Sequence, residues 1–251
     1  MVIPIKKPGS SQHSIDSYRP IIALTSVMCK IMERILVNRL TWYLEKNTLL
    51  NPNQAGFRCN RSTIDQLLRL HTDASNSIKA KKQTVAILLD FSKAFDLFWH
   101  EGLLHKLYKM GITGRIYSWI ENFLSARTIQ VRVGASLSQT KSVDMGTPQG
   151  SVLSPLLFLL MVADFPEDKR SLIETSLFAD DSAIWKSGRY TAHIWKCLQA
   201  HLDVIHRWCT TWGFIINAKK TYSITFTHMR NAKLPAHFKI ANEMVEHVPT
   251  V

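Results

Sequence analysis

Residues 176–185 read Ser-Leu-Phe-Ala-Asp-Asp-Ser-Ala-Ile-Trp, two short apolar runs on either side of an acidic pair. The pattern predicts two strands joined by a tight turn at Asp180 and Asp181. Two adjacent carboxylates in apolar surroundings repel each other, so they must take up a proton or bind a cation. Asp also favours turns for conformational reasons alone, so an ordinary hairpin turn explains the pair equally well when it is taken by itself.

A third acidic residue, Asp90, follows the run Thr84 to Leu89. That run is continuously apolar and rich in strand-forming residues, which is typical of a strand buried on both faces. Carboxylates from two strands can hold hard divalent cations, and Mg²⁺ needs few of them because it keeps water and substrate oxygens. A pair of such ions activates the attacking oxygen and stabilises the leaving oxygen in phosphoryl transfer. We therefore predict that Asp90 converges with Asp180 and Asp181.

A bent loop is expected ahead of a helix that begins near Ser154. Residues 147–155 read Thr-Pro-Gln-Gly-Ser-Val-Leu-Ser-Pro, so Pro restricts the backbone, Gly allows a sharp bend, and Gln149 lies at the apex. Ser154 is a good helix cap, and Pro155 is tolerated in the first turn. A rigid loop with one amide side chain suits contact with a ligand, and the free N–H groups of a helix start suit phosphate. An ordinary loop-to-helix joint is the alternative interpretation.

Apolar spacing predicts the remaining elements of the chain. Helices are expected at 25–50, from 62 onward, and at 102–110, 113–124 and 193–212, and strands at 130–133 and 222–226. Residues 1–20 are polar and turn-rich and are expected to form a strand, an extended loop and a return. Strands and helices are mixed without a regular strand–helix–strand alternation, which favours the α+β class.

The net charge of the 251-residue chain is +12 and is concentrated in its first third. Residues 1–82 hold 13 Lys or Arg against 5 Asp or Glu, a balance of +8. Such a segment suits a polyanionic partner such as nucleic acid, although a solubilising surface explains charge alone equally well. The longest apolar runs are too short to cross a bilayer, which takes about 20 residues. The four cysteines form no C-x-x-C pair, which indicates reduced thiols of a cytosolic or nuclear protein.

Taken together, these pieces resemble the reverse transcriptases of non-LTR retrotransposons, of the LINE type and jockey-like. Four stretches carry the resemblance: YRPI (18–21) with QAGFR (54–58) and RST (61–63); LDFSKAFD (89–96) with WH (99–100); PQGSVLSP (148–155); and FADD (178–181) followed by WGF (212–214) and NAKKT (217–221). Each stretch is weak alone. The set occurs in the family's order and covers nearly the whole chain, so it is very specific.

The resemblance implies roles for the acidic residues and their neighbours. Asp90 and Asp180 are similar to the principal metal ligands, Asp181 to the third acidic member, and the backbone carbonyl of Phe91 would complete one metal's shell. The implied cofactor is a pair of Mg²⁺ ions, for which Mn²⁺ can substitute. Phe95 stands where the family carries a bulky gate under the incoming sugar. A ring there leaves no room for a 2′-hydroxyl, so dNTP is accepted over rNTP.

Further residues are implied to contact the nucleotide. They are Gln149 in the nucleotide pocket, Arg19 with Lys6 or Lys7 at the triphosphate, Lys220 beside the departing pyrophosphate, and Arg58 at the template or the nucleotide. Taken without the resemblance, these cations are ordinary surface charges and Phe95 is an ordinary core residue. The resemblance is therefore what gives them a function.

A right-hand polymerase fold follows from the same resemblance. Residues 1–83 with part of 112–145 would form the fingers, and residues 84–111 and 146–251 the palm, of one discontinuous domain. Proteins of this kind usually carry an endonuclease before this region and a thumb and a Cys-rich tail after it, and none of these is in the 251 residues. We expect a fragment with an absent or incomplete thumb, which binds nucleic acid but polymerises poorly or not at all.

The implied reaction is attack of a primer 3′-hydroxyl on the α-phosphate of a dNTP, directed by an RNA template. The implied partners are RNA template, DNA primer and dNTP, with no membrane, in a ribonucleoprotein of the nucleus or the cytoplasm. Two alternatives stay open. One is a catalytically inactive nucleic-acid-binding relic of a mobile element. The other is a different palm polymerase, such as an RNA-copying RNA polymerase or an intron-encoded reverse transcriptase, although Phe95 argues against the use of ribonucleotides.

Overall fold

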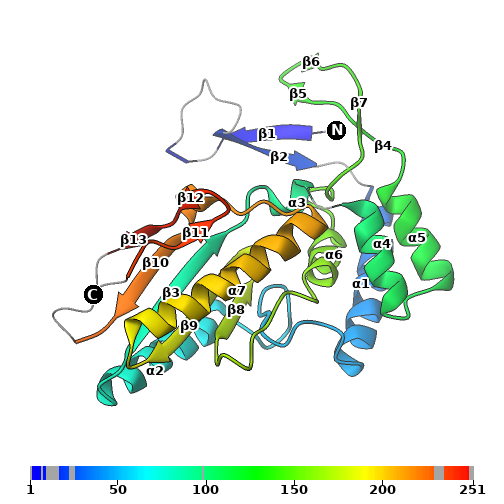
Figure 1. The fold of residues 1–251 in the computed structure, drawn as a ribbon. Helices are drawn as coiled ribbons and strands as arrows, with labels where there is room; N and C mark the ends of the chain where they lie inside the picture. Colours follow the sequence, from blue (N-terminus) through cyan, green and yellow to red (C-terminus); the bar gives the residue numbers. More distant parts are fainter. Residues whose placement is uncertain are drawn as a thin grey trace. The chain divides into compact units, whose positions relative to one another are not determined.

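The computed structural model describes residues 2–6, 8–9, 17–22, 26–97, 99–228 and 235–248. The chain forms two compact units, each built from two separate stretches of sequence. Unit 1 comprises Met1–Leu50 and Phe95–Ala163, and unit 2 comprises Asn51–Ala94 and Asp164–Val251. Both units mix helices with mainly antiparallel strands (Figure 1), in agreement with the predicted α+β class.

Unit 2 is organised around a five-stranded sheet with the strand order β13-β10-β3-β9-β8. The strands are β3 (Gln83–Asp90), β8 (Glu174–Phe178), β9 (Asp181–Gly188), β10 (Tyr222–Phe226) and β13 (Glu246–Val248). Neighbours are antiparallel except for the parallel pair β10 and β13. The central strand β3 is buried along most of its length, but Leu88 is 43% exposed. The prediction of a strand buried on both faces is therefore wrong at this position.

Two helices of unit 2, α2 (Thr63–Lys79) and α7 (Thr191–Trp212), pack on the sheet. The indole N–H of Trp185 donates to the Asp73 carboxylate of α2 at 2.9 Å. A Cβ atom at Gly188 would lie 3.2 Å from Cγ1 of Ile194 in α7. Successive residues of a strand point to opposite faces, so residues 185 and 188 place the two helices on opposite faces of the sheet. The remaining elements of unit 2 are η2 (Ala218–Lys220), β11 (Lys239–Ile240) and β12 (Glu243–Met244).

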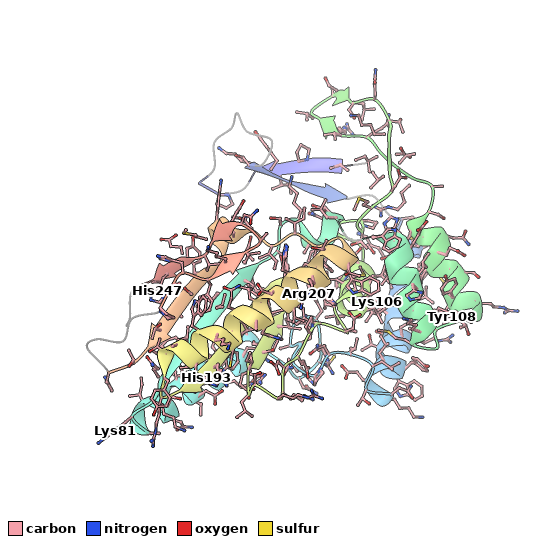
Figure 2. The ribbon with its side chains drawn as sticks, viewed as in Figure 1. Lys81, Lys106, Tyr108, His193, Arg207 and His247 are labelled. Atoms are coloured by element: carbon pink, nitrogen blue, oxygen red, sulfur yellow. The ribbon has the colours of Figure 1, made fainter. Side chains whose placement is uncertain are left out.

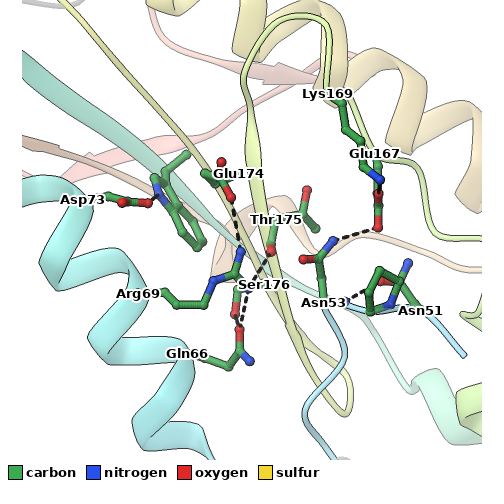
Figure 3. Close-up of polar contacts among 12 residues, drawn as sticks. Asn51, Asn53, Gln66, Arg69, Asp73, Glu167, Lys169, Glu174, Thr175 and Ser176 are labelled. Carbon is green, nitrogen blue, oxygen red and sulfur yellow. Dashed lines mark hydrogen bonds and ion pairs between the residues drawn. The ribbon is translucent and has the colours of Figure 1, made fainter. Parts of the chain in front are cut away.

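Polar contacts fasten α2 to the edge strand β8 (Figure 3). The Ser176 hydroxyl donates to Oε1 of Gln66 at 2.7 Å, and the Arg69 guanidinium lies 3.2 Å from the Glu174 carboxylate. The Arg69 pair is partly exposed, so it contributes roughly 1 kcal/mol or less. The strand that leads into the acidic turn is thus held along its length by a helix.

Unit 1 is built from helices with small two-stranded sheets around them. The helices are α1 (Val27–Lys46), α3 (Ala94–Leu97) at its boundary, α4 (His100–Lys109), α5 (Gly114–Leu124) and α6 (Ser154–Met161). The sheets pair β1 (Val2–Lys6) with β2 (Tyr18–Ile22), β4 (Arg127–Ile129) with β7 (Lys141–Val143), and β5 (Arg132–Val133) with β6 (Ser136–Leu137).

Helix α6 forms the core of unit 1, because nearly all of its residues are buried. Lys106 of α4, labelled in Figure 2, is also buried, and its ammonium group donates to the carbonyl oxygen of Met161. The last carbonyl groups of a helix have no partner within the helix, so the Lys106 ammonium group caps the C-terminal end of α6. No helix in the described part of the chain is both long and apolar enough to cross a membrane.

Two detailed predictions for unit 1 are wrong. The apolar spacing that predicts the helix at 25–50 includes Val27 and Ile31 on one face, but these are 74% and 49% accessible, whereas Glu33 is 0% accessible. Ser154 is not the cap of α6: the cap position is Leu153, which has no side-chain capping bond. The buried Glu33 of α1 accepts hydrogen bonds from the start of α6 instead, and sequence spacing does not show which residues so distant a side chain contacts.

Candidate active site

The three acidic residues lie at one end of the sheet of unit 2. Strands β3 and β9 are antiparallel, and Asp90 lies directly opposite Asp181. Side chains directly opposite each other in such a pair lie on one face, with Cβ atoms about 4.5–5.5 Å apart. Ala179 and Asp180 form the two-residue connection between β8 and β9. The structure thus brings together the three residues that the sequence analysis singled out.

Their electrostatics favour a positive ligand. The pKa of Asp181 is raised, first by burial of its carboxyl group and then by the negative charges of Asp180 and Asp90. Carboxylate oxygens are the ligands of hard divalent cations, so this donor set fits Mg²⁺. Within the described ranges, no group of three or more His, Cys, Asp or Glu side chains is arranged so that it could hold a metal ion by itself. Substrate and water oxygens would have to complete the shell, and metal binding stays a prediction.

The turn that carries Asp180 has a strained backbone. Ala179 adopts a φ of 54°. The left-handed region costs a residue other than Gly about 1–2 kcal/mol. Strain of this kind persists only where the surrounding structure enforces it, and it is concentrated at functional sites. Other contacts must therefore hold this turn in place.

A cavity of about 360 Å³ lies beside the acids, and Asp90, Asp181 and Lys220 are among the residues that line it. The N–H of Asn217 donates to the carbonyl oxygen of Asp90 at 2.8 Å, and the N–H of Asp90 donates to the Thr221 hydroxyl at 3.4 Å. These two bonds join the segment that carries Lys220 to the end of β3. The structure therefore places Lys220 at the same cavity as two of the acids.

The side chain of Phe91 belongs to the core of unit 2. It is 8% exposed, and its ring centroid lies 5.8 Å from that of Phe214 and 6.4 Å from that of Phe165. This packing fixes the backbone immediately after Asp90. The metal contact expected of Phe91 concerns its carbonyl group, and it stays a prediction.

Phe95 and Gln149 belong to unit 1, where both have partners. The Phe95 ring stacks on Phe158 with centroids 4.6 Å apart, and its carbonyl oxygen accepts from the N–H of Thr147 at 2.8 Å. The Gln149 amide donates to both carboxylate oxygens of Asp96, at 2.9 and 3.1 Å. The loop with Gln149 is thus joined to the segment with Phe95, through Asp96, which ends the LDFSKAFD stretch but was given no role by the sequence analysis.

The same loop is held by a second set of contacts that sequence reasoning missed. The carbonyl oxygen of Gly146 lies 2.6 Å from Nε2 of His100 and accepts from Arg127 at 2.6 Å. Burial lowers the pKa of His100, the nearby Arg127 charge lowers it further, and the bond to Gly146 and the charge of Asp144 oppose the shift. A Cβ atom at Gly146 would overlap the backbone of Asp96. The close approach therefore requires Gly.

Glu33 of α1 is the third contact missed in unit 1. One of its carboxyl oxygens accepts from the Ser151 hydroxyl at 2.6 Å, from the N–H of Val152 at 2.6 Å and from the N–H of Leu153 at 3.2 Å. It thus serves the donors at the start of α6. An acid within the apolar spacing of residues 25–50 was the available signal for it.

The cations predicted at the nucleotide are placed as follows. Arg58 of unit 2 donates to the carbonyl oxygens of Asn51 and Gln54 at 2.8 and 3.3 Å, so one of its nitrogens serves the loop itself. Lys6 is exposed at the end of β1, and Arg19 lies on β2 opposite Ile5. Lys7 lies outside the described residues. The nucleotide contacts of these residues stay predictions.

Comparison with known sequences decides the family. The pattern described as "Reverse transcriptase (RNA-dependent DNA polymerase)" matches residues 5–239. The chain belongs to this reverse transcriptase family. It is 34% identical over 235 residues to the RNA-directed DNA polymerase from mobile element jockey of Drosophila melanogaster, covering 90% of this chain and 25% of that protein. It is 28% identical to a Pol polyprotein from type-1 retrotransposable element R2 of Popillia japonica, covering 88% of this chain and 31% of that protein. The resemblance to jockey-like elements is thus confirmed.

Solved structures support the fold. A telomerase from Candida tropicalis, in complex with a fragment of telomeric RNA, matches with a TM-score of 0.57 at 12% identity, over 85% of this chain and 35% of that chain. An apo form of that telomerase truncated from its C-terminal domain matches with a TM-score of 0.57 at 13% identity, over 86% and 49%. These likenesses agree with a polymerase palm and fingers. The reverse transcriptase chain spans about a quarter of the length of the curated relatives.

Proposed function

We propose that the chain is the catalytic core of an RNA-directed DNA polymerase of a non-LTR retrotransposon. It adds dNTPs to a primer 3′-hydroxyl by phosphoryl transfer, with an RNA template and two divalent ions, Mg²⁺ or in its place Mn²⁺. The observation that carries the proposal is the position of Asp90 opposite Asp181, with Asp180 in the adjoining turn. Membership of the reverse transcriptase family gives this acidic cluster its chemistry.

The acidic cluster would act through its oxygens. The carboxylates of Asp90, Asp180 and Asp181, with the carbonyl of Phe91, would hold the ions. When bound, the ions supply positive charge to the attacking hydroxyl and to the leaving pyrophosphate. Lys220, at the same cavity, would bring a further positive charge and a transferable proton to the departing pyrophosphate.

The remaining predicted residues would select and hold the nucleotide. Phe95 would lie under the sugar and exclude a 2′-hydroxyl, and Gln149 would line the pocket. Arg19, Lys6, Lys7 and Arg58 would contact the triphosphate or the template. In this assignment residues 1–83, with part of 112–145, act as fingers, and residues 84–111 and 146–251 act as palm.

The template and primer would be held mainly through their phosphates. The chain carries a net charge of +12, and residues 1–82 account for +8 of it. Contacts of Lys and Arg with phosphates release condensed counterions, so affinity falls linearly with salt on logarithmic axes. We propose that this binding is largely independent of sequence and takes place inside the cell, in the nucleus or the cytoplasm.

Primer extension on poly(rA)–oligo(dT) tests the proposed function. We expect weak addition of dTMP, because the chain is expected to polymerise poorly, and this addition should require Mg²⁺ or Mn²⁺ and be lost in Asp180→Ala. Asp203→Ala is the matched control, because Asp203 is an exposed acid on α7 of the same unit. Retained extension in Asp180→Ala would refute the active site. Salt-sensitive binding by the unaltered protein with no addition of dTMP would refute polymerase activity of these 251 residues and would favour the nucleic-acid-binding relic.

A further inference from the structure

The loop Asn51–Arg58 runs along the strand that leads into the acidic turn. The N–H of Ala55 donates to the carbonyl oxygen of Leu177 at 2.8 Å. The N–H of Leu177 donates to the carbonyl oxygen of Asn53 at 3.0 Å. Gln54 and Leu177 form a parallel bridge. Because β8 is the edge strand of the sheet, this loop covers its free edge and brings Gln54 to the turn.

Gln54 bonds both polar groups of the strained turn residue. Its amide oxygen accepts from the N–H of Ala179 at 3.0 Å, and its amide nitrogen donates to the carbonyl oxygen of Ala179 at 3.3 Å. The same amide oxygen accepts from the N–H of Gly56 at 2.8 Å. Gln54 is 1% exposed, so water does not replace these bonds. The side chain thus bonds the peptide group before Ala179 through its N–H and the peptide group after it through its C=O. We call this pair of hydrogen bonds the clamp.

The loop approaches the turn as closely as a backbone allows. A Cβ atom at Gly56 would overlap the nitrogen of Ala179 and would lie 2.9 Å from its Cα. Gly56 does not have a positive φ, so it is required here for space and not for conformation. The loop itself is anchored, because Asn53 donates to the Glu167 carboxylate at 2.7 Å, as Figure 3 shows.

A neutral amide suits this position. Asp180 and Asp181 follow Ala179 directly, so a charged partner would either repel the acids or compete with a bound cation. An amide offers one donor and one acceptor without adding charge, and it matches the C=O and N–H of the turn.

We propose that Gln54 is a positioning residue for the acidic cluster. By bonding Ala179 on both sides, it holds the turn in the conformation that directs Asp180 and Asp181 toward Asp90. The role of this positioning in catalysis rests on the proposed function. The two hydrogen bonds to Ala179 are observed whatever the function is.

Amide exchange of Ala179, measured by NMR on the 251-residue chain, tests the clamp. Gln54→Ala should lower the protection of this amide by about tenfold relative to that of Ile87 in β3, which corresponds to one hydrogen bond. Gln54→Glu keeps an acceptor for the N–H but loses the donor to the Ala179 carbonyl and adds a negative charge beside Asp180 and Asp181, so it should restore little of the protection. Cys59→Ala, at an exposed residue immediately after the loop, should leave the protection unchanged. Equal protection of Ala179 in Gln54→Ala and in the unaltered chain would overturn the proposal.

Binding of Mn²⁺ alone tests the positioning. Broadening of the Asp180 and Asp181 amides should need about tenfold more Mn²⁺ in Gln54→Ala, as is usual for loss of a group that orients metal ligands. Cys59→Ala should titrate like the unaltered chain. Lost protection with unchanged Mn²⁺ binding would overturn the positioning role. No broadening in the unaltered chain would count against the proposed function, and the amide exchange would still decide the clamp.

Discussion

The acidic turn of unit 2 and the segment 151–153 of unit 1 each make hydrogen bonds with a buried polar side chain from a distant part of the sequence. At the turn this is Gln54, which is 1% exposed and bonds both polar groups of Ala179. At the loop it is Glu33, which is 0% exposed and accepts three bonds from residues 151–153. The two devices differ in charge.

The difference follows from what each side chain faces. Glu33 meets the start of α6, where backbone N–H groups lack partners and the helix dipole favours an anion. Gln54 meets a turn with two carboxylates, where an anion would be repelled. The local field thus determines which polar residue can be buried. A buried carboxylate is therefore favourable beside unpaired N–H groups, and a neutral amide is favourable beside other carboxylates.

The largest effect is expected at Glu33. Glu33→Ala removes the acceptor of the Ser151 hydroxyl and of the Val152 N–H, while the Leu153 N–H keeps the Ser151 hydroxyl at 3.1 Å, and it should lower the free energy of unfolding by about 3 kcal/mol. Glu33→Gln keeps one acceptor oxygen and should cost about 1 kcal/mol. Glu45→Ala, an exposed acid on the same helix, should cost less than about 0.5 kcal/mol. Urea unfolding measures the free energy of unfolding of all three variants. If Glu33→Ala lowers it no more than Glu45→Ala does, Glu33 does not hold residues 151–153 in the way that Gln54 holds the turn.

The next effect is expected at Gly56. Gly56→Ala forces the loop away from Ala179 and should cost about 3 kcal/mol, since the atoms it overlaps are backbone. Gly134→Ala is the matched control: its φ is 60°, and a Cβ atom there would meet nothing within 4 Å. It should cost only the left-handed strain, about 1–2 kcal/mol. Equal losses on urea unfolding would mean that the approach to Ala179 is not tight.

A smaller effect, on selectivity, is expected at Phe95 beside the loop of unit 1. Phe95→Ala should raise incorporation of rNTP relative to dNTP by about tenfold, since removing the ring opens space for a 2′-hydroxyl. The measurement is the ratio of the two incorporation rates in primer extension. Phe158→Leu, which alters the stacking partner of the ring, is the control for loss of packing. An unchanged ratio with normal dNTP use would make Phe95 a core residue only.

The smallest effects are on pH dependence, and they have opposite signs in the two regions. The pKa of His100 is lowered from its ordinary 6.5, so the unfolded chain binds the proton first, and stability falls as pH falls below 6.5. The pKa of Asp181 is raised from its ordinary 3.8, so stability is lost as pH rises through the raised value. Asp181 is exposed, so solvent screening keeps its share small.

Urea unfolding between pH 4 and 8 separates the two contributions. His100→Gln should flatten the slope below pH 6.5, and Asp181→Asn should flatten the loss of stability above pH 3.8 and raise stability at neutral pH. If His100→Gln leaves the slope below pH 6.5 unchanged, or Asp181→Asn leaves the loss above pH 3.8 unchanged, the burial of that side chain does not affect stability as described.

Local sequence signals predicted the parts of the molecule that depend on local physics. Helix α2 begins where Ser62 and Asp65 form a capping box, and α7 ends at Gly213, which has a left-handed conformation. The turn at Asp180 lies between the two apolar runs of residues 176–185, as the sequence predicts. Each of these features depends on residues a few positions apart, which sequence spacing can show.

The two clamps could not be predicted, because they depend on long-range contacts. Gln54 and Ala179 are 125 residues apart, and Glu33 and Ser151 are 118 apart. Within the sequence Gln54 is only a polar residue in a loop, and Glu33 interrupts an otherwise apolar helix face. The exposed Val27 and the buried Glu33 reverse the expected pattern of α1, because burial there is set by the loop it meets.

The central claim is that Asp90 and Asp181, paired across β3 and β9, act as one catalytic unit. The most direct test is the rate of addition of a single dTMP to poly(rA)–oligo(dT), with protein in excess, for Asp90→Asn, Asp181→Asn and the double variant. Each single variant should lose at least about 100-fold, and the double variant should lose little more, because residues that act as a unit are not additive. A rate within tenfold of the unaltered chain in either single variant, or losses that multiply in the double variant, would contradict the account.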